Sequence, residues 1–322
     1  MSLLEVKNLC VDYEMRRGTA RAVNNVNFTL EKGETLGLIG ESGCGKTTAA
    51  MSILGFVTSP GRIAEGEVIF KGKNLRNFTD EQMRQLRGMS MSIVRQEAQN
   101  ALNPVLTVGE QIGEVLREHG IRNKIDVEDR VDSLLEMVGI SPERKKSYPF
   151  EFSGGMRQRV MIALAAIAEP ELMILDEPIT GLDVIVQRQL LNLLNDLKNK
   201  MNLTALLIAH DLSVIAEMCS RVAVMYGGFI VEKADVVDLY EKPLHPYSKA
   251  LIESYPRIHG EKKKLVSIPG SPPHLLSPPE SCLFAERCKK ATEKCFRCIP
   301  EETIIDSRMV RCHLYSEEEC NV

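Results

Sequence analysis

The sequence predicts an α/β fold with a largely parallel central sheet, and three features support this prediction. A glycine-rich loop at residues 40–47 stands between a short apolar run and a helical segment. Two further apolar runs, 172–175 and 205–208, are unbroken, as is typical of parallel strands covered on both faces. Residues 81–140 repeat apolar side chains at steps of three and four, which predicts an inserted helical segment.

The first strands are predicted from alternating apolar residues. Alternation is present at Leu4 and Val6, at 9–13 and again at 26–30, where a turn follows at 31–34. Such alternation is typical of half-buried antiparallel strands. With a further strand at 66–70, we expect an antiparallel β-layer around the glycine-rich loop.

The loop itself reads Gly-Glu-Ser-Gly-Cys-Gly-Lys-Thr, the complete pattern of a phosphate-binding loop. Glycines let the backbone turn its N–H groups inward, and the following helix points its positive end at the same phosphates. A glycine-rich turn without a ligand is the alternative. The nucleotide-binding candidates are Gly40, Ser42, Gly43, Cys44, Gly45, Lys46, Thr47 and Thr48, with Lys46 on the terminal phosphates and Thr47 on Mg²⁺.

Two adjacent carboxylates, Asp176 and Glu177, follow the apolar run at 172–175. Asp176 can organise the ligand shell of Mg²⁺, and Glu177 can orient and polarise an attacking water. The alternative is a solvated acidic turn. Together with the phosphate loop, the pair predicts nucleotide hydrolysis.

A second candidate anion site lies at 152–159, where a serine at a predicted helix start is followed by two glycines. Exposed backbone N–H groups at such a position can bind phosphate. A simple helix N-cap is the alternative. The candidate residues are Ser153, Gly154 and Gly155.

Charge, hydropathy and the N-terminal residues indicate where in the cell the protein is expected and which partners are not. The 322 residues carry a formal net charge of −4 with both signs interspersed, which gives no indication of a nucleic-acid surface. No run approaches the roughly 18 apolar residues of a membrane span. The N-terminus lacks the pattern of a secretory signal, so we expect a location inside the cell.

The cysteines are unevenly distributed. Six of the nine lie in the C-terminal end, at Cys282, Cys288, Cys295, Cys298, Cys312 and Cys320. Proline-rich stretches at 243–247 and 268–280 precede them, as expected of a linker. The pattern predicts a separate module with its own ligand or redox chemistry.

With these motifs in this order, residues 1–255 resemble the ATPase subunit of an ABC transporter. The resemblance implies a P-loop NTPase (RecA-like) core with an N-terminal antiparallel β-subdomain, a helical subdomain at about 97–165 and a Cys-rich extension at 256–322. The sequence departs from the family pattern at two places. Residues 94–98 lack the residues that usually flank the family's glutamine, and Met156 stands where many members have glutamine.

The resemblance also assigns residue roles. Tyr13 would stack on adenine, Gln96 would sense the γ-phosphate and Mg²⁺, and His210 would contact the γ-phosphate. Asp183 would lie in the loop that couples two ATP sites. The alternatives are an ordinary strand aromatic for Tyr13, a polar loop residue for Gln96 and a structural role for His210. The catalytic candidates are therefore Glu177, His210 and Gln96.

In this family the signature serine and the phosphate loop of one chain do not reach the same nucleotide, so the resemblance implies an ATP-dependent homo- or heterodimer. ATP would lie between the loop of one ATPase subunit and Ser153 of the other. The expected partners are a second ATPase subunit, two membrane permease subunits and, indirectly, an extracytoplasmic substrate-binding protein. No nucleic acid is expected, and the location would be peripheral, at the cytoplasmic face of the membrane.

Residues 243–247, 268–273 and 282–288 resemble the C-terminal extension of importers for oligopeptides, dipeptides and sometimes nickel. Four cysteines in this extension match those associated with a 4Fe-4S iron–sulfur cluster in some members. A zinc site and free thiols are the alternatives, because thiolates bind zinc as well as iron–sulfur clusters. Disulfides are disfavoured by the reducing cytosol. The four are Cys282, Cys288, Cys295 and Cys312.

The expected function is ATP hydrolysis that powers import of di- and oligopeptides, with ATP, Mg²⁺ and an iron–sulfur cluster as cofactors. An importer of nickel or another small solute is one alternative. A DNA-repair ATPase is a second, although the sequence has no long coiled coil or zinc hook. A regulatory module without turnover is a third, against which Glu177 and His210 argue. The transported substrate is not encoded in this chain.

Overall fold

The computed structural model describes residues 2–16, 18–95, 101–255, 267–273, 275–276 and 279–316. Its contacts divide the chain into two compact units, each assembled from separated segments. The first unit contains Leu30–Thr35 and Asn77–Leu207. The second contains Ser2–Thr29, Leu36–Arg76 and Ile208–Val322.

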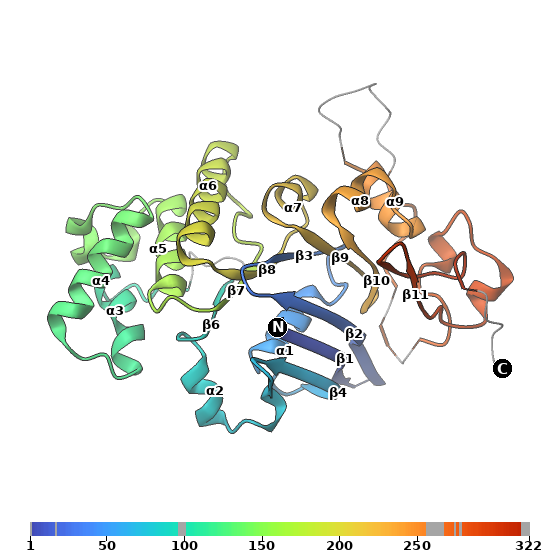
Figure 1. Cartoon of the computed structure of the whole chain (residues 1–322), viewed down its shortest axis with the longest axis horizontal. Coiled ribbons are helices and arrows are strands. Elements are labelled where there is room, and N and C mark those ends of the chain that lie inside the picture. Colours follow the sequence, from blue (N-terminus) through green and yellow to red (C-terminus); the bar gives the residue numbers. More distant parts are fainter. Residues whose placement is uncertain are drawn as a thin grey trace. The chain divides into compact units, whose positions relative to one another are not determined.

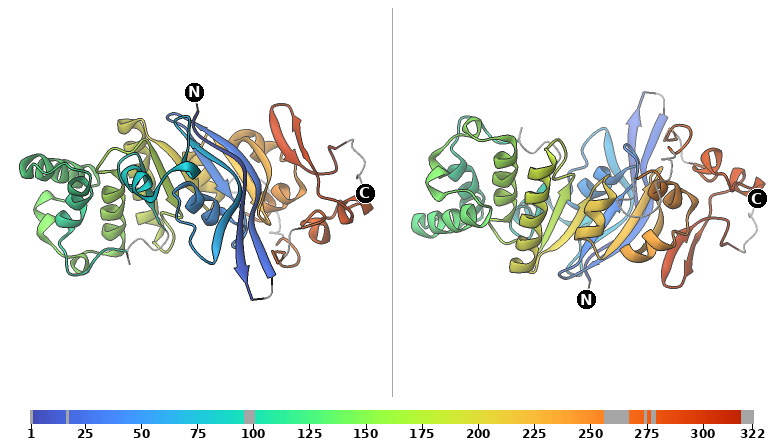
Figure 2. Two further views of the ribbon diagram at one scale, coloured as in Figure 1. Left: turned by 90° about the horizontal axis from the view of Figure 1, so that it is seen from below. Right: turned by 90° about the horizontal axis from the view of Figure 1, so that it is seen from above.

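The N-terminal strands form an antiparallel sheet. Its strands, in the order β2-β1-β4-β5, are Gly18–Glu31, Ser2–Met15, Gly61–Phe70 and Lys73–Asn74. Figure 2 shows the long strands of this sheet. Leu4 lies opposite Phe70 and Tyr13 opposite Gly61. The pairing of β1 with β4 is antiparallel, which confirms the prediction, and Leu4 and Val6 are both buried.

The second unit also holds the strand that leads into the phosphate loop, β3 (Thr35–Ile39), which is buried along its whole length. It pairs in parallel with β9 (Arg221–Tyr226), and β10 (Phe229–Asp235) continues the sheet in the antiparallel sense. A hairpin of β11 (Glu302–Ile305) and β12 (Arg308–Arg311) extends it through β10. Part of the cysteine-containing segment therefore continues the sheet of the loop strand.

The α-helices in the described part of the second unit are α1 (Lys46–Ile53), α7 (Leu212–Met218), α8 (Val236–Glu241) and α9 (Pro246–Glu253). The start of α9 lies in a stretch that the sequence predicts as linker. Proline fits the first helical position because its missing N–H has no partner there anyway. His245 caps the helix, since its Nδ1 accepts a 2.9 Å hydrogen bond from the amide of Tyr247.

The first unit contains parallel strands in the order β8-β7-β6, namely Thr204–Ile208, Leu172–Asp176 and Met91–Val94. Met91 pairs with Leu172 in the parallel register between β6 and β7. The parallel prediction for 172–175 is thus confirmed. The helical prediction for 81–140 is wrong at β6, because a buried strand of four residues is too short to show a period of its own.

The helices of the first unit are α2 (Asp80–Leu86), α3 (Val108–Glu118), α4 (Lys124–Met137), α5 (Gly154–Ala166) and α6 (Val184–Met201). Helices α3, α4 and α5 pack against one another (Figure 1). They bury the predicted apolar stripe, including Val108, Ile112, Leu116, Val131, Leu134 and Leu135. Polar caps start the helices, with Thr107 forming a capping box at α3 and Asn123 capping α4.

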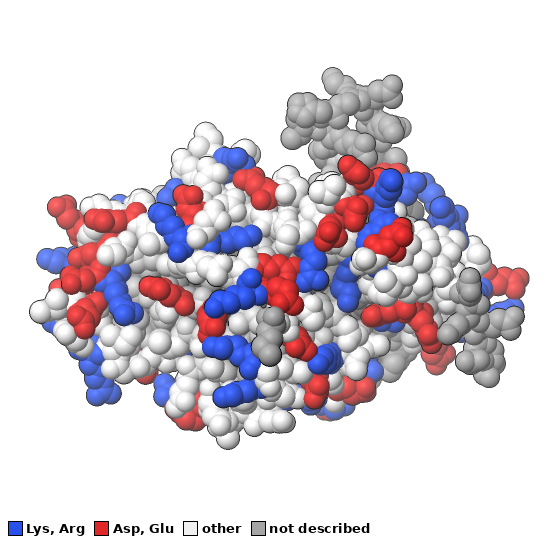
Figure 3. All heavy atoms as spheres, viewed as in Figure 1, with Lys and Arg blue, Asp and Glu red and all other residues white. Residues whose placement is uncertain are grey.

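The surface carries charges of both signs. Lys and Arg side chains alternate with Asp and Glu side chains over the face in Figure 3, in line with the balanced composition. Within the described ranges, no helix combines the length and apolar character needed to cross a bilayer.

Candidate nucleotide-binding site

The phosphate loop joins β3 to α1, and its glycines are required by its geometry. Gly43 and Gly45 have positive φ angles of 79° and 104°. A Cβ atom at Gly45 would lie 2.2 Å from the carbonyl oxygen of Ala22, and one at Gly40 would lie 2.1 Å from that of Met225. Because both neighbours are backbone atoms, neither could move aside cheaply, so only glycine fits at these positions.

Lys46 is buried at the first position of α1, with 6% of its surface exposed. Its Nζ donates hydrogen bonds to the carbonyl oxygens of Gly40, at 2.8 Å, and Glu41, at 3.0 Å. Ser42 and Thr47 are exposed by contrast. The loop therefore buries the ammonium group of Lys46, while the hydroxyl groups of Ser42 and Thr47 face solvent. This arrangement suits an anionic ligand.

Cys44 is buried within the same loop, with its Sγ 3.7 Å from Nζ of Lys46. Burial raises the pKa of the Cys44 thiol, and the nearby charge of Lys46 opposes that rise. The thiol is consequently protonated at neutral pH and serves as a packing group. Thr48, the last candidate of this group, is half-buried in α1.

Tyr13 lies on β1 and is half-buried. Its ring packs against Gly61, where a Cβ atom would lie 2.7 Å from the ring carbon Cε1. The opposing glycine therefore makes room for the aromatic face. This packing accounts for the side chain's place in the sheet, and adenine stacking stays a prediction.

Asp176 and Glu177 lie where β7 ends. Asp176 is its last residue and is 2% exposed, whereas Glu177 is half-buried. Glu177 adopts a left-handed backbone with a φ of 49°, which is uncommon for a residue other than glycine. Oγ1 of Thr180 donates a 3.1 Å hydrogen bond to its carboxylate. Such strain at a strand end is frequent at functional sites.

Ser153 caps α5. Its Oγ accepts a 3.3 Å hydrogen bond from the amide of Met156. A Cβ atom at Gly155 would lie 2.6 Å from Cγ1 of Val186, so a glycine is needed where the starts of α5 and α6 approach each other. Asp183 caps α6 in the same way, accepting from the amides of Ile185 and Val186. Both capping residues thus fix helix starts, and their nucleotide roles stay predictions.

One polar residue near these helices is missing from the sequence analysis. Gln158, on α5, is buried, and its side-chain amide donates a 2.6 Å hydrogen bond to the carbonyl oxygen of Pro178. Pro178 directly follows Glu177. The helix that starts at Ser153 is therefore tied to the turn that carries the second carboxylate. A glutamine on an otherwise apolar helix face is the only sequence signal for this contact.

His210 follows β8 and is exposed, and its carbonyl oxygen accepts a hydrogen bond from the hydroxyl of Tyr255. Gln96 lies outside the described residues. The phosphate loop, Tyr13 and His210 belong to the second unit, whereas Asp176, Glu177, Asp183 and the start of α5 belong to the first.

Among the four cysteines predicted as cluster ligands, the amide of Cys282 donates to the carbonyl oxygen of Cys295 at 3.0 Å. Burial raises the pKa of Cys282 to about 12 and that of Cys312 to about 11, with the neighbouring thiols adding to both shifts.

Within the described part of the chain, no three His, Cys, Asp or Glu side chains are placed to hold a metal ion. The described residues therefore give no support to the predicted iron–sulfur cluster at Cys282, Cys288, Cys295 and Cys312, or to the zinc alternative. No chemistry is assigned to a metal at these residues.

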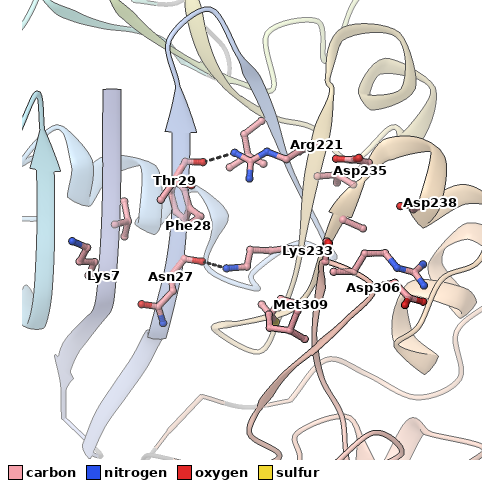
Figure 4. A pocket seen from close by; sticks show the side chains of 17 residues that line it. Lys7, Asn27, Phe28, Thr29, Arg221, Lys233, Asp235, Asp238, Asp306 and Met309 are labelled. Atoms are coloured by element: carbon pink, nitrogen blue, oxygen red, sulfur yellow. Dashed lines mark hydrogen bonds between the residues drawn. The ribbon is translucent and has the colours of Figure 1, made fainter. Parts of the chain in front are cut away.

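A pocket of about 430 Å³ lies in the second unit, between the N-terminal sheet and the β11–β12 turn (Figure 4). Lys233 Nζ donates to the carbonyl oxygen of Asn27 at 2.8 Å, and Arg221 donates to that of Thr29 at 2.9 Å. Three carboxylates also line the pocket, at Asp235, Asp238 and Asp306. This mixture of charges favours no ligand class, and the described lining residues include none of the nucleotide-binding candidates.

The model of the ABC transporter family matches residues 23–180. A second model, for the C-terminal region of oligopeptide/dipeptide transporters, matches residues 231–295. The two matches occur in the order that the motifs predict.

Several curated relatives are similar over nearly the full length. The oligopeptide transport ATP-binding protein AppD of Bacillus subtilis is 47% identical, covering 98% of each chain. The dipeptide transport ATP-binding protein DppD of the same organism is 44% identical, covering 98% of this chain and 95% of DppD. The oligopeptide transport ATP-binding protein OppD of Escherichia coli is 42% identical, covering 98% and 94%.

Solved structures show the same fold. The dimeric ATP-binding cassette MJ0796 in a post-hydrolysis state with ADP and Pi superposes with a TM-score of 0.65 at 25% identity, covering 72% of this chain and 98% of that one. CbiO1 of Clostridium perfringens, part of the transporter complex cbiONQ, gives 0.64 at 25% identity, covering 75% and 92%.

Proposed function

The chain belongs to the family of ABC transporter ATP-binding proteins, and we propose that it hydrolyses ATP to power import of di- and oligopeptides through separate membrane permease subunits. The observation that carries this proposal is the joint presence of a phosphate loop with its buried lysine and a C-terminal region of the oligopeptide/dipeptide transporter type. The relatives named for peptide transport favour peptides over nickel, DNA repair or regulation without turnover.

ATP binding is assigned to the second unit. The backbone amides of Ser42, Gly43, Cys44 and Gly45 would surround the phosphates, and Lys46 would leave its carbonyl partners to bind the terminal phosphates. Thr47, exposed at the start of α1, would bind Mg²⁺, whereas Gly40 and Thr48, at the two edges of the loop, would contact the nucleotide. Tyr13 would stack on adenine.

Hydrolysis is assigned to the carboxylates. Asp176 would hold the Mg²⁺ shell and Glu177 would orient the attacking water, while His210 and Gln96 would contact the γ-phosphate. His210 is exposed and Glu177 is only half-buried, which supports these roles, since a catalytic group has to reach water and substrate. Mg²⁺, when bound, would neutralise charge on the phosphates.

Dimerisation follows from the second anion site. Ser153, Gly154 and Gly155 would bind the ATP held by a second ATPase subunit, and Asp183 would couple the two sites. The dimeric MJ0796 structures support this proposal. ATP would favour the closed dimer by the difference between its affinities for the closed and open states, and loss of the γ-phosphate would remove that difference.

The proposed layout has a RecA-like core within 1–255, an N-terminal β-subdomain, a helical subdomain at about 97–165 and a C-terminal extension at 256–322. Packing of α3, α4 and α5 supports the helical subdomain. We propose a peripheral location at the cytoplasmic face of the membrane, where two permease subunits and a substrate-binding protein would complete the importer.

The test is ATP turnover by the complete importer in proteoliposomes. Adding a peptide with the binding protein should raise the rate of phosphate release, and a matched preparation with Lys46→Ala should show no response. Stimulation by nickel and not by any peptide would contradict the proposal.

A further inference from the structure

A buried arginine of the C-terminal segment contacts the phosphate loop directly. Arg287 exposes 5% of its side chain, and its guanidinium forms two hydrogen bonds of 2.6 and 2.8 Å with the carboxylate of Glu41. The third nitrogen donates to the carbonyl oxygen of Pro269 at 2.7 Å, and the Tyr226 hydroxyl accepts a further bond at 3.1 Å. A bidentate arginine–carboxylate pair with this much support has one well-defined geometry.

Glu41 is the second residue of the phosphate loop, and it is held at three points. Arg287 holds its carboxylate, and its amide donates to the hydroxyl of Tyr247 at 2.9 Å. Its carbonyl oxygen accepts from Nζ of Lys46 at 3.0 Å. Two of these three partners lie more than 200 residues further along the chain, at separations of 206 and 246.

The two distant partners share a rigid aromatic support. Tyr226, Tyr247 and Phe284 are all buried, and their ring centroids lie 4.5 to 5.4 Å apart. Phe284 directly precedes the short 3₁₀ turn Ala285–Arg287 that presents the arginine. The turn is thereby packed against the body of the second unit.

Two physical effects follow for nucleotide binding. A loop held before ATP arrives loses less conformational freedom on binding than a mobile one. In addition, a carboxylate in a phosphate loop repels the triphosphate unless its charge is neutralised, and Arg287 neutralises that of Glu41.

We propose that Arg287 and Tyr247 are positioning residues of the phosphate loop, and that through Arg287 the C-terminal extension sets the affinity of the second unit for ATP. This inference rests on the proposed assignment of residues 40–47 as the ATP site. It gives the extension a role within the nucleotide site that is independent of any metal at its cysteines.

The chain offers a matched control in Arg311. This residue is also buried in the C-terminal segment, pairs with Glu302 at 2.7 Å and lies 5.1 Å over the ring of Phe229. Among the described residues, its hydrogen bonds go to the carbonyl oxygen of Pro300 and to Glu302, neither of which lies in the phosphate loop. Arg311→Ala therefore costs the extension a comparable ion pair and ring contact while leaving Glu41 in place.

The experiment measures Kd for the Mg²⁺ complex of a non-hydrolysable ATP analogue by calorimetry on the full chain, with thermal unfolding to verify folding. Arg287→Ala should raise Kd about tenfold, and Arg311→Ala should leave it within about twofold. Adding Glu41→Gln to Arg287→Ala should recover most of the lost affinity, because it removes the unneutralised charge. In ATPase assays, Arg287→Ala should raise KM with little change in kcat, as expected for lost uniform binding.

Unchanged affinity in a folded Arg287→Ala protein would overturn the inference, as would equal weakening by Arg311→Ala or failure of Glu41→Gln to restore affinity. If Arg287→Ala does not fold, Tyr247→Phe decides: it removes only the hydroxyl that holds the Glu41 amide and should raise Kd about threefold. Unchanged Kd in that variant would then overturn the inference. Failure of the unsubstituted chain to bind the analogue would instead contradict the proposed function.

Discussion

Gln158 of helix α5 and Pro178 of the turn after β7 are joined by a buried 2.6 Å hydrogen bond from the side-chain amide to the carbonyl oxygen. Ser153 starts the same helix, and Glu177 immediately precedes the proline. The helix with the signature serine and the turn with the second carboxylate are thus parts of one connected structure in the first unit.

Replacing Gln158 by methionine should lower both stability and kcat. The substitution keeps the side-chain volume but leaves the carbonyl oxygen of Pro178 buried without this donor, at a cost of about 1–3 kcal/mol. Urea unfolding would measure the loss of stability and phosphate release the change in kcat. Gln85→Met, at an exposed position of α2, is the control and should change neither. A Gln158→Met protein with unchanged kcat would show that the contact is only structural.

Replacing Lys46 by alanine should abolish detectable ATP binding, with Kd raised about 100-fold or more, because the cation that meets the terminal phosphates is lost. Calorimetry with Mg-ATP analogue measures this effect. Lys73→Ala, at an exposed site on β5, should bind as the unsubstituted chain does. Retained affinity in Lys46→Ala would mean that the loop does not hold the nucleotide.

Cys44 should react slowly with maleimide reagents at pH 7 and faster as the pH rises. Burial raises the pKa of this thiol, so the reactive thiolate is scarce until the pH exceeds the ordinary thiol range. Once attached, a bulky group should block ATP binding, and ATP should protect the thiol. Mass spectrometry follows the labelling, with Cys44→Ser as the control. Full ATPase activity after complete labelling of Cys44 would contradict this prediction.

Because of His245, the free energy of unfolding of the protein should decrease at acid pH. Burial lowers the pKa of this imidazole from 6.5 to about 3. Below pH 6.5 the unfolded chain takes up a proton that the folded chain does not, so folding becomes less favourable by about 1.4 kcal/mol per pH unit, down to about pH 3.

Urea unfolding at pH 7 and pH 5 measures that loss. His245→Asn keeps a capping side chain without the titrating ring, and its free energy of unfolding should fall about 2 kcal/mol less over this interval. The raised pKa of the nearby Glu232 contributes to both proteins and cancels in the comparison. Equal losses in the two proteins would mean that His245 is protonated in the folded state.

The sequence alone predicted those elements whose conformation depends on a local pattern of residues. Alternation predicted β1, unbroken apolar runs predicted β7 and β8, and the glycine spacing predicted the loop whose conformation leaves no room for a Cβ at Gly40 or Gly45. Each of these patterns reflects a period or a backbone angle of a few neighbouring residues.

The remaining features depend on pairing between distant segments. Strand β6 is recognisable only beside β7, and the hairpin of β11 and β12 joins the sheet through β10. The contact of Arg287 with Glu41 spans 246 residues and has no local signal. The cysteine spacing, in contrast, indicated a metal that the geometry of the described residues does not support, because spacing along the chain does not fix where thiols point.

The most direct test of the account is ATP turnover by Glu177→Gln, compared with Glu169→Gln, a second glutamate with a left-handed backbone at a φ of 52°. If Glu177 orients the attacking water, its substitution should lower kcat about 100-fold or more while Mg-ATP still binds and holds a stable dimer in sedimentation runs. Glu169→Gln should turn over normally. Near-normal hydrolysis by Glu177→Gln, or a monomer at every concentration with saturating Mg-ATP and each candidate partner subunit, would contradict the account.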